Sequence, residues 1–122
     1  MELKWENDKT EWEQDGFVIL AEFVPDYGLL YSEIFNELSP ERRTEYDNDE
    51  WHYGGIVVSV AKRLPNLKGD KWTKRRGDIV LAEESLWGIE SDSSDEYFSL
   101  VAQELASEAI EEAQQTLKDL TA

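Results

Sequence analysis

The sequence predicts an α+β protein: a three-stranded antiparallel sheet (a fourth strand is the alternative), a long C-terminal helix packed on one face, and a short helix after the first strand. Three runs rich in β-branched and aromatic residues, 17–24, 51–61 and 78–87, are bounded by turn formers, as strands are. Residues 95–119 repeat apolar side chains at helical spacing. A helix laid across one sheet face covers both apolar surfaces most simply. The 122 residues favour a single domain spanning 1–122.

The C-terminal helix is the best-defined element of the sequence. Ser93 with Glu96 three residues later predicts a capping box at its start. Trp87, at the end of the preceding strand, is expected to be buried between sheet and helix, close to Val101 or Leu105. The residues predicted to form the apolar face are Phe98, Val101, Ala102, Leu105, Ala109, Ile110, Ala113, Leu117 and Leu120.

The opposite side of this helix is acidic. Its four glutamates share an arc of roughly 100° at about 100° per residue, and they span about 12 Å of axis at about 1.5 Å per residue. Phosphates along one strand of duplex DNA rise by a comparable step of about 3.4 Å, so such a face can pair with arginines of a nucleic-acid site on another protein. The commoner alternative is an ordinary solvated face. The predicted partner-binding residues are Glu104, Glu108, Glu111 and Glu112.

The N-terminal half predicts less regular structure around its strands. Residues 1–15 are polar and predict a helical or irregular lead-in that fixes Trp5, Trp12 or both to the core. The spacing of apolar residues over 29–38 predicts a short helix, which Ser39-Pro40 ends.

Residues 41–50 are charged and rich in turn formers, so they predict an exposed connector. The alternative is a helical turn with Ser39 as the cap and Pro40 in the first position. Gly54-Gly55, inside the second predicted strand, indicates a bulge or a close approach of another group.

Charge is the strongest compositional feature, with a formal net charge of −16. Residues 1–61 carry −11, residues 62–76 carry +6, and residues 77–122 carry −11. Such a field attracts basic partners and repels nucleic acid outside 62–76, although solubility alone also explains surplus acid. The basic segment with Trp72 could grip single-stranded nucleic acid. Because its flanks repel that polymer, we expect instead a solvated loop, or one that folds back on the acidic surface.

Several classes of function are disfavoured by the residues present. There is no cysteine, no phosphate-binding glycine loop and no dinucleotide fingerprint. The only histidine, His52, is expected to be structural. The N-terminus lacks a secretory pattern and no apolar run approaches about 20 residues, so a cytoplasmic protein without membrane contact is expected. We predict no enzyme, cofactor or metal, since acidic pairs arise by chance in such a chain: Asp47/Asp49/Glu50, Glu83/Glu84 and Asp92/Asp95/Glu96.

Three stretches together resemble a known group of proteins. They are Trp51-x-Tyr53-x-Gly55-Ile56-Val57-Val58, the string Ser85-Leu86-Trp87-Gly88-Ile89-Glu90-Ser91, and the helix positions Tyr97, Val101, Glu104-Leu105, Glu108-Ala109-Ile110 and Glu112-Ala113. Over residues 50–118 the chain resembles small bacteriophage proteins of unassigned function, and it differs from them in its longer basic excursion and its N-terminal third. The resemblance implies a phage or prophage origin. Small acidic phage proteins often block a host protein, sometimes by imitating DNA, and this group brings no catalytic residues.

Three functional hypotheses follow. The first is an inhibitor that binds a basic, nucleic-acid-handling host protein through the acidic helix face, such as a CRISPR effector (an anti-CRISPR), a restriction enzyme or a transcription factor. The second is a phage structural or accessory protein that acts by self-association or with a phage partner. The third is a nucleic-acid binder that uses residues 62–76.

Overall fold

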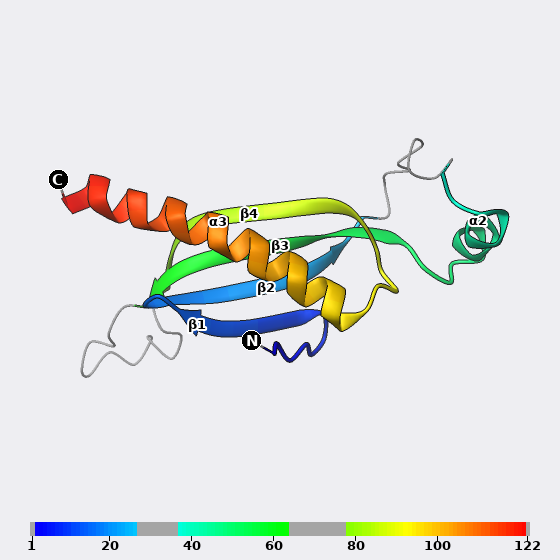
Figure 1. Cartoon of the computed structure of the whole chain (residues 1–122), viewed down its shortest axis with the longest axis horizontal. Coiled ribbons are helices and arrows are strands. Elements are labelled where there is room, and N and C mark those ends of the chain that lie inside the picture. The colour runs from blue at the N-terminus through cyan, green and yellow to red at the C-terminus, as the bar shows by residue number, and fades with distance from the viewer. Residues whose placement is uncertain (1, 27–36, 64–77, 122) are drawn as a thin grey trace, which may run out of the picture.

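The computed structural model describes residues 2–26, 37–63 and 78–121 (Figure 1). Its elements, in chain order, are β1 (Lys9–Gln14), β2 (Phe17–Pro25), α2 (Pro40–Asp47), β3 (Tyr53–Arg63), β4 (Asp78–Glu90) and α3 (Asp95–Thr121). The strands form one antiparallel sheet in the order β1-β2-β3-β4. The long helix α3 runs diagonally across one face of this sheet, and α2 lies at the far end of the molecule (Figure 1). The α+β class, the antiparallel sheet and the long C-terminal helix are thus confirmed.

The sheet has four strands because residues 9–14, predicted as part of a lead-in, form a strand. Along β1, Thr10 is buried and Trp12 is partly buried, whereas Lys9, Glu11 and Glu13 are exposed, which is the period-two pattern of an edge strand. Asp15 and Gly16 then adopt φ values of 54° and 83°, as a two-residue hairpin turn requires. Trp5 and Trp12 pack against the core, as expected.

The short helix follows the second strand of the sheet and not the first, because β1 precedes the strand predicted first. The helix predicted over 29–38 falls largely on 27–36, outside the described residues. Helix α2 begins at Pro40, and the Ser39 hydroxyl accepts a hydrogen bond from the Arg42 N–H at 3.3 Å. The capped turn considered as the alternative is therefore confirmed and extends to Asp47, so the exposed connector predicted for 41–50 is wrong over its first seven positions.

The start of α3 is displaced by one residue from its prediction. The Ser94 hydroxyl accepts a hydrogen bond from the Tyr97 N–H at 3.1 Å, and Ser94 therefore caps the helix. The Ser93 hydroxyl instead donates to the Glu90 carbonyl at 2.7 Å and closes the turn that leaves β4. The predicted capping box of Ser93 with Glu96 is therefore wrong, since the run of five serine and aspartate residues at 91–95 offers competing caps.

The prediction that Trp87 is buried between the sheet and α3 is wrong, because 42% of the residue is exposed. Its backbone pairs with Gly55, one position away from the Ile56–Leu86 pair that lies on the helix side of the sheet. Successive strand residues face opposite ways, so Trp87 lies on the other face. There its ring occupies the space above Gly55, where a Cβ atom would come within 2.5 Å of the indole. The register also shifts between Gly54 and Gly55, so both predictions for the glycine pair are confirmed.

The core between sheet and helix is aromatic at one end and made of alanines and larger aliphatic residues along the rest of α3. Phe98 stacks on Phe23 with ring centroids 5.2 Å apart and lies 5.7 Å from Trp5. Further along, α3 faces the sheet with alanines that are fully buried, which lets its backbone lie close to β3 and β4. These are Ala102, Ala106, Ala109 and Ala113.

Phe98→Ala tests this assignment of the core. We expect it to lower the free energy of unfolding by about 3–5 kcal/mol, because it removes a buried ring and leaves a cavity. Trp87→Ala is the matched control and should cost less than half as much. Denaturant unfolding measures both values, and equal losses in the two variants would contradict the burial described here.

Candidate functional site

The outer face of α3 carries the four glutamates predicted from the sequence, and all four are exposed. Within the described part of the chain, Glu104, Glu108 and Glu111 take part in no ion pair; the ion pairs there involve Lys9, Arg42 and Arg63. Helix α3 holds seven acidic residues and one basic residue, Lys118, in its last turn. The face is therefore a row of largely uncompensated carboxylates.

Glu84 of β4 extends this row onto the sheet. Its backbone pairs with Val58, which is fully buried on the helix side, so the Glu84 side chain points toward α3. A hydrogen bond with Glu112, together with the charge of that carboxylate, raises the pKa of Glu84 above its ordinary value. We call Glu84, Glu104, Glu108, Glu111 and Glu112 the acidic ridge.

The raised pKa of Glu84 determines how its contribution to the stability of the fold changes with pH. A group with a raised pKa in the folded state stabilises the fold below its ordinary pKa, and this contribution is lost as the pH rises through the raised value. The negative charge of Glu112 thus makes it harder for Glu84 to ionise. A cation placed between them offsets that charge, so the ridge is chemically suited to bind lysine or arginine.

The sequence analysis missed Glu84 as a member of the ridge. It identified Glu83 and Glu84 only as a chance acidic pair. The available signal was strand periodicity, because alternate residues of 78–87 face the helix, but the bulges in β3–β4 pairing obscure the register in sequence.

Two cations of the basic segment are described, and both contact the protein itself. Arg63 makes ion pairs with Glu13 at 2.9 Å and with Glu11 at 3.4 Å, across the sheet face opposite α3. The Lys62 ammonium lies 5.7 Å from the centroid of the Phe17 ring. The predictions for 64–76, including Trp72, lie outside the described residues.

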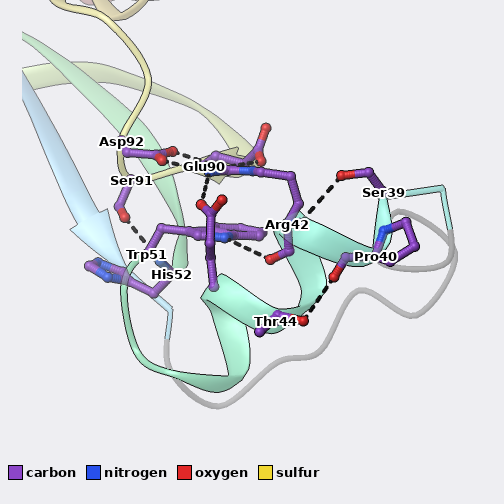
Figure 2. Close-up of polar contacts among 10 residues, drawn as sticks. Ser39, Pro40, Arg42, Thr44, Trp51, His52, Glu90, Ser91 and Asp92 are labelled. Carbon is purple, nitrogen blue, oxygen red and sulfur yellow. Dashed lines mark hydrogen bonds and ion pairs between the residues drawn. The ribbon is translucent and has the colours of Figure 1, made fainter.

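The densest polar cluster surrounds Arg42 of α2 (Figure 2). Its two terminal nitrogens donate to the two carboxylate oxygens of Asp92 at 2.8 and 2.9 Å. The same nitrogens donate to Glu90 at 2.6 Å and to Glu45 at 2.9 Å, and the guanidinium lies 4.4 Å from the centroid of the Trp51 ring. Arginine is suited to this position because its planar guanidinium can donate several hydrogen bonds in one plane while its face stacks on an aromatic ring.

The Arg42 cluster fixes the path of the chain into α3. The Trp51 indole N–H donates to the Arg42 carbonyl at 3.1 Å (Figure 2). The His52 N–H donates to the Ser91 hydroxyl at 2.9 Å, and the Ser91 N–H donates to the His52 carbonyl at 2.8 Å. These bonds hold the segment after β4 against the start of β3, so the cluster positions α3 and with it the acidic ridge.

The Arg42 cluster also shifts the pKa values of its members. The hydrogen bond from Arg42 lowers the pKa of Asp92, and hydrogen bonds with Asp92 and Glu90 raise the pKa of Arg42. Burial raises the pKa of the Tyr53 hydroxyl. The sequence analysis did not predict this cluster, since Arg42 and Asp92 lie 50 residues apart.

His52, the histidine identified from the sequence, lies beside the aromatic part of the core. The His52 ring lies 6.0 Å from the Phe23 ring. In the described ranges, no three acidic, histidine or cysteine side chains gather closely enough to bind a metal ion. Those same ranges include no helix long and apolar enough to cross a membrane.

Comparison with known proteins leaves the site to be argued from its own chemistry. No protein-family model matches the chain, and no curated protein or solved structure matches it significantly. The resemblance to phage proteins therefore stays a prediction.

Asp92→Asn tests the Arg42 cluster. Because the pKa of Asp92 is lowered, its contribution to stability is present above its ordinary pKa and is lost as the pH falls through the lowered value. We expect the variant to lose about 1 kcal/mol at pH 7, a small value because Asp92 is half exposed and screened. The difference from the parent should shrink below about pH 4.

Urea unfolding at several pH values measures this effect, with Glu50→Gln as the control for removing an exposed acid. A loss that is the same at pH 7 and pH 3 would show that the Asp92 carboxylate does not stabilise the fold through Arg42.

Proposed function

We propose that this protein is a non-enzymatic acidic binding protein that occupies the nucleic-acid site of a basic host protein. The acidic ridge is the binding surface. The resemblance noted above suggests a phage protein that acts in the host cytoplasm against a defence or transcription protein, in the manner of a DNA mimic.

The single observation that carries this proposal is the row of exposed glutamates along one face of α3, which Glu84 extends onto β4. Glu84 lies beside Glu112, whose hydrogen bond and charge raise the pKa of Glu84. In the described part of the chain, neither carboxylate takes part in an ion pair. A basic partner would neutralise this pair and the three glutamates beside it, and it would be attracted over a distance by the net charge of −16.

Two alternatives have less support. A phage structural or accessory protein that self-associates would bring two strongly acidic surfaces together. A nucleic-acid binder would need the cations of 62–76 free for phosphate, whereas Arg63 is held by Glu11 and Glu13. The acidic ridge favours the first hypothesis over both.

Reversing Glu104, Glu108, Glu111 and Glu112 to lysine tests the proposal. The tagged parent chain is used to capture basic proteins from a bacterial lysate at about 50 mM salt, and the captured protein is purified. The fourfold variant should bind it at least tenfold more weakly, because screened attraction across the interface becomes repulsion. Labelled duplex DNA or RNA should compete with the parent chain for the captured protein.

The matched control reverses four exposed acids that lie off α3 and gives the same net charge: Glu2, Glu41, Asp47 and Glu50. This control should keep most of the affinity. Equal weakening in both variants, binding unchanged between about 50 and 500 mM salt, or simultaneous binding of nucleic acid and parent chain would each contradict the proposal.

A further inference from the structure

Strand β4 is an edge of the sheet. In the strand order β1-β2-β3-β4, β3 is its only strand neighbour among the described residues. It is 13 residues long, and alternate residues of an edge strand direct their backbone N–H and C=O groups away from the sheet. β4 therefore offers a long row of hydrogen-bonding groups to another strand.

Exposed apolar side chains lie on both sides of this edge. Leu86 is 45% exposed on the helix side, and its neighbour Trp87 is 42% exposed on the opposite side. Natural edges are commonly protected by proline, lysine, β-bulges or a very short strand. β4 contains neither proline nor lysine. Its pairing with β3 is irregular at Gly54/Gly55 and at Val60/Ala61, but it is regular between these points, over residues 82–87. Its central charges are the carboxylates Glu83 and Glu84, which leave its pairing groups accessible to a strand of opposite charge.

A second copy of the chain does not fit this edge. Antiparallel pairing of two β4 strands about their middle residue, Glu84, would set Glu84 of one copy directly opposite Glu84 of the other. Like charges directly opposite each other destabilise a strand pair. An extended segment with alternating basic residues would instead be attracted, because its lysine or arginine side chains would lie opposite the Glu84 carboxylate.

We propose that the edge of β4 takes up an extended basic segment of the partner as a fifth strand. Backbone hydrogen bonds to β4 hold the segment, its basic side chains contact Glu84 and Glu112 on the helix side, and its apolar side chains cover Trp87 on the other. This inference rests on the proposed function for the basic character of the partner, and it adds the conformation that the partner adopts and the element that recognises it.

The test uses a synthetic nine-residue peptide of alternating lysine and valine. N-methyl groups on alternate amides block one of its edges, so that the peptide cannot aggregate and keeps one edge free to pair. The control peptide has the same sequence of side chains, but it carries N-methyl groups along both edges, so that neither edge can pair with a strand. Fluorescence anisotropy of the labelled peptides measures binding to the full chain.

We expect the peptide with one free edge to bind at least tenfold more tightly than the control peptide. Glu84→Lys should weaken its binding by about tenfold, the effect of turning an attractive cross-strand pair into a repulsive one. Glu84→Gln should weaken it less, and Asp47→Lys, on α2 at the far end, should leave it unchanged. Amide exchange of β4 should slow when the peptide binds.

Three results would overturn the edge proposal: equal binding of both peptides, no binding of either, or a parent chain that is a dimer in ultracentrifugation and dissociates on Glu84→Lys. Equal, salt-sensitive binding of both peptides would reject strand addition and leave the acidic surface as the binding site. Conversely, strand-dependent peptide binding combined with an intact partner complex in the fourfold α3 variant would reject the proposed function and keep the edge site.

Discussion

The close packing of α3 on β3 and β4 is the constraint on which the rest of the structure depends. Four fully buried alanines on the contacting face let the helix backbone lie near the sheet, and the larger buried residues Val101, Leu105 and Ile110 fill the space beside them, so the helix cannot rotate without driving a charged side chain into the core. This orientation fixes which glutamates face outward. It also brings Glu112 against Glu84, which faces α3 because its backbone partner Val58 is buried beneath the helix. The acidic ridge is thus a consequence of core packing and not of charge composition alone.

Two sets of contacts fix the start of α3. Phe98, Phe23 and Trp5 anchor its first turns through ring contacts. Arg42 joins α2 to Glu90 and Asp92, in the segment that leads from β4 into α3. The Arg42 guanidinium is hydrogen-bonded to three carboxylates and lies against the Trp51 ring. In the basic segment, Lys62 lies near Gly16 and Phe17, and Arg63 makes ion pairs with Glu11 and Glu13. These three described cations thus contact residues outside the acidic ridge.

Sequence patterns predicted the elements whose periodicity is long and strong. The strands predicted at 17–24 and 78–87 and the helix predicted at 95–119 are present and extend by one to three residues at their C-terminal ends, whereas the strand predicted at 51–61 is present but shifted by two residues, to Tyr53–Arg63. β1 was missed because its outward residues, Lys9, Glu11 and Glu13, hide the alternation of a mainly polar strand. Trp87 was placed on the wrong face because the bulge at Gly54-Gly55 shifts the register, which local sequence does not encode. The outward glutamates of α3 followed from helical spacing, whereas Glu84 and the Arg42 cluster depend on contacts between distant segments, which spacing cannot reveal.

The central claim is that Glu84 and Glu112 are held together as mutually repelling carboxylates in the free protein. Titration of the glutamate side-chain carboxyl carbons by NMR measures this directly. The account predicts that Glu84 titrates above the ordinary glutamate value of about 4.3, and that Glu112→Gln, which removes the neighbouring charge, lowers the pKa of Glu84 toward that value. A Glu84 that titrates at the ordinary value in the parent, and does not change in the variant, would contradict it.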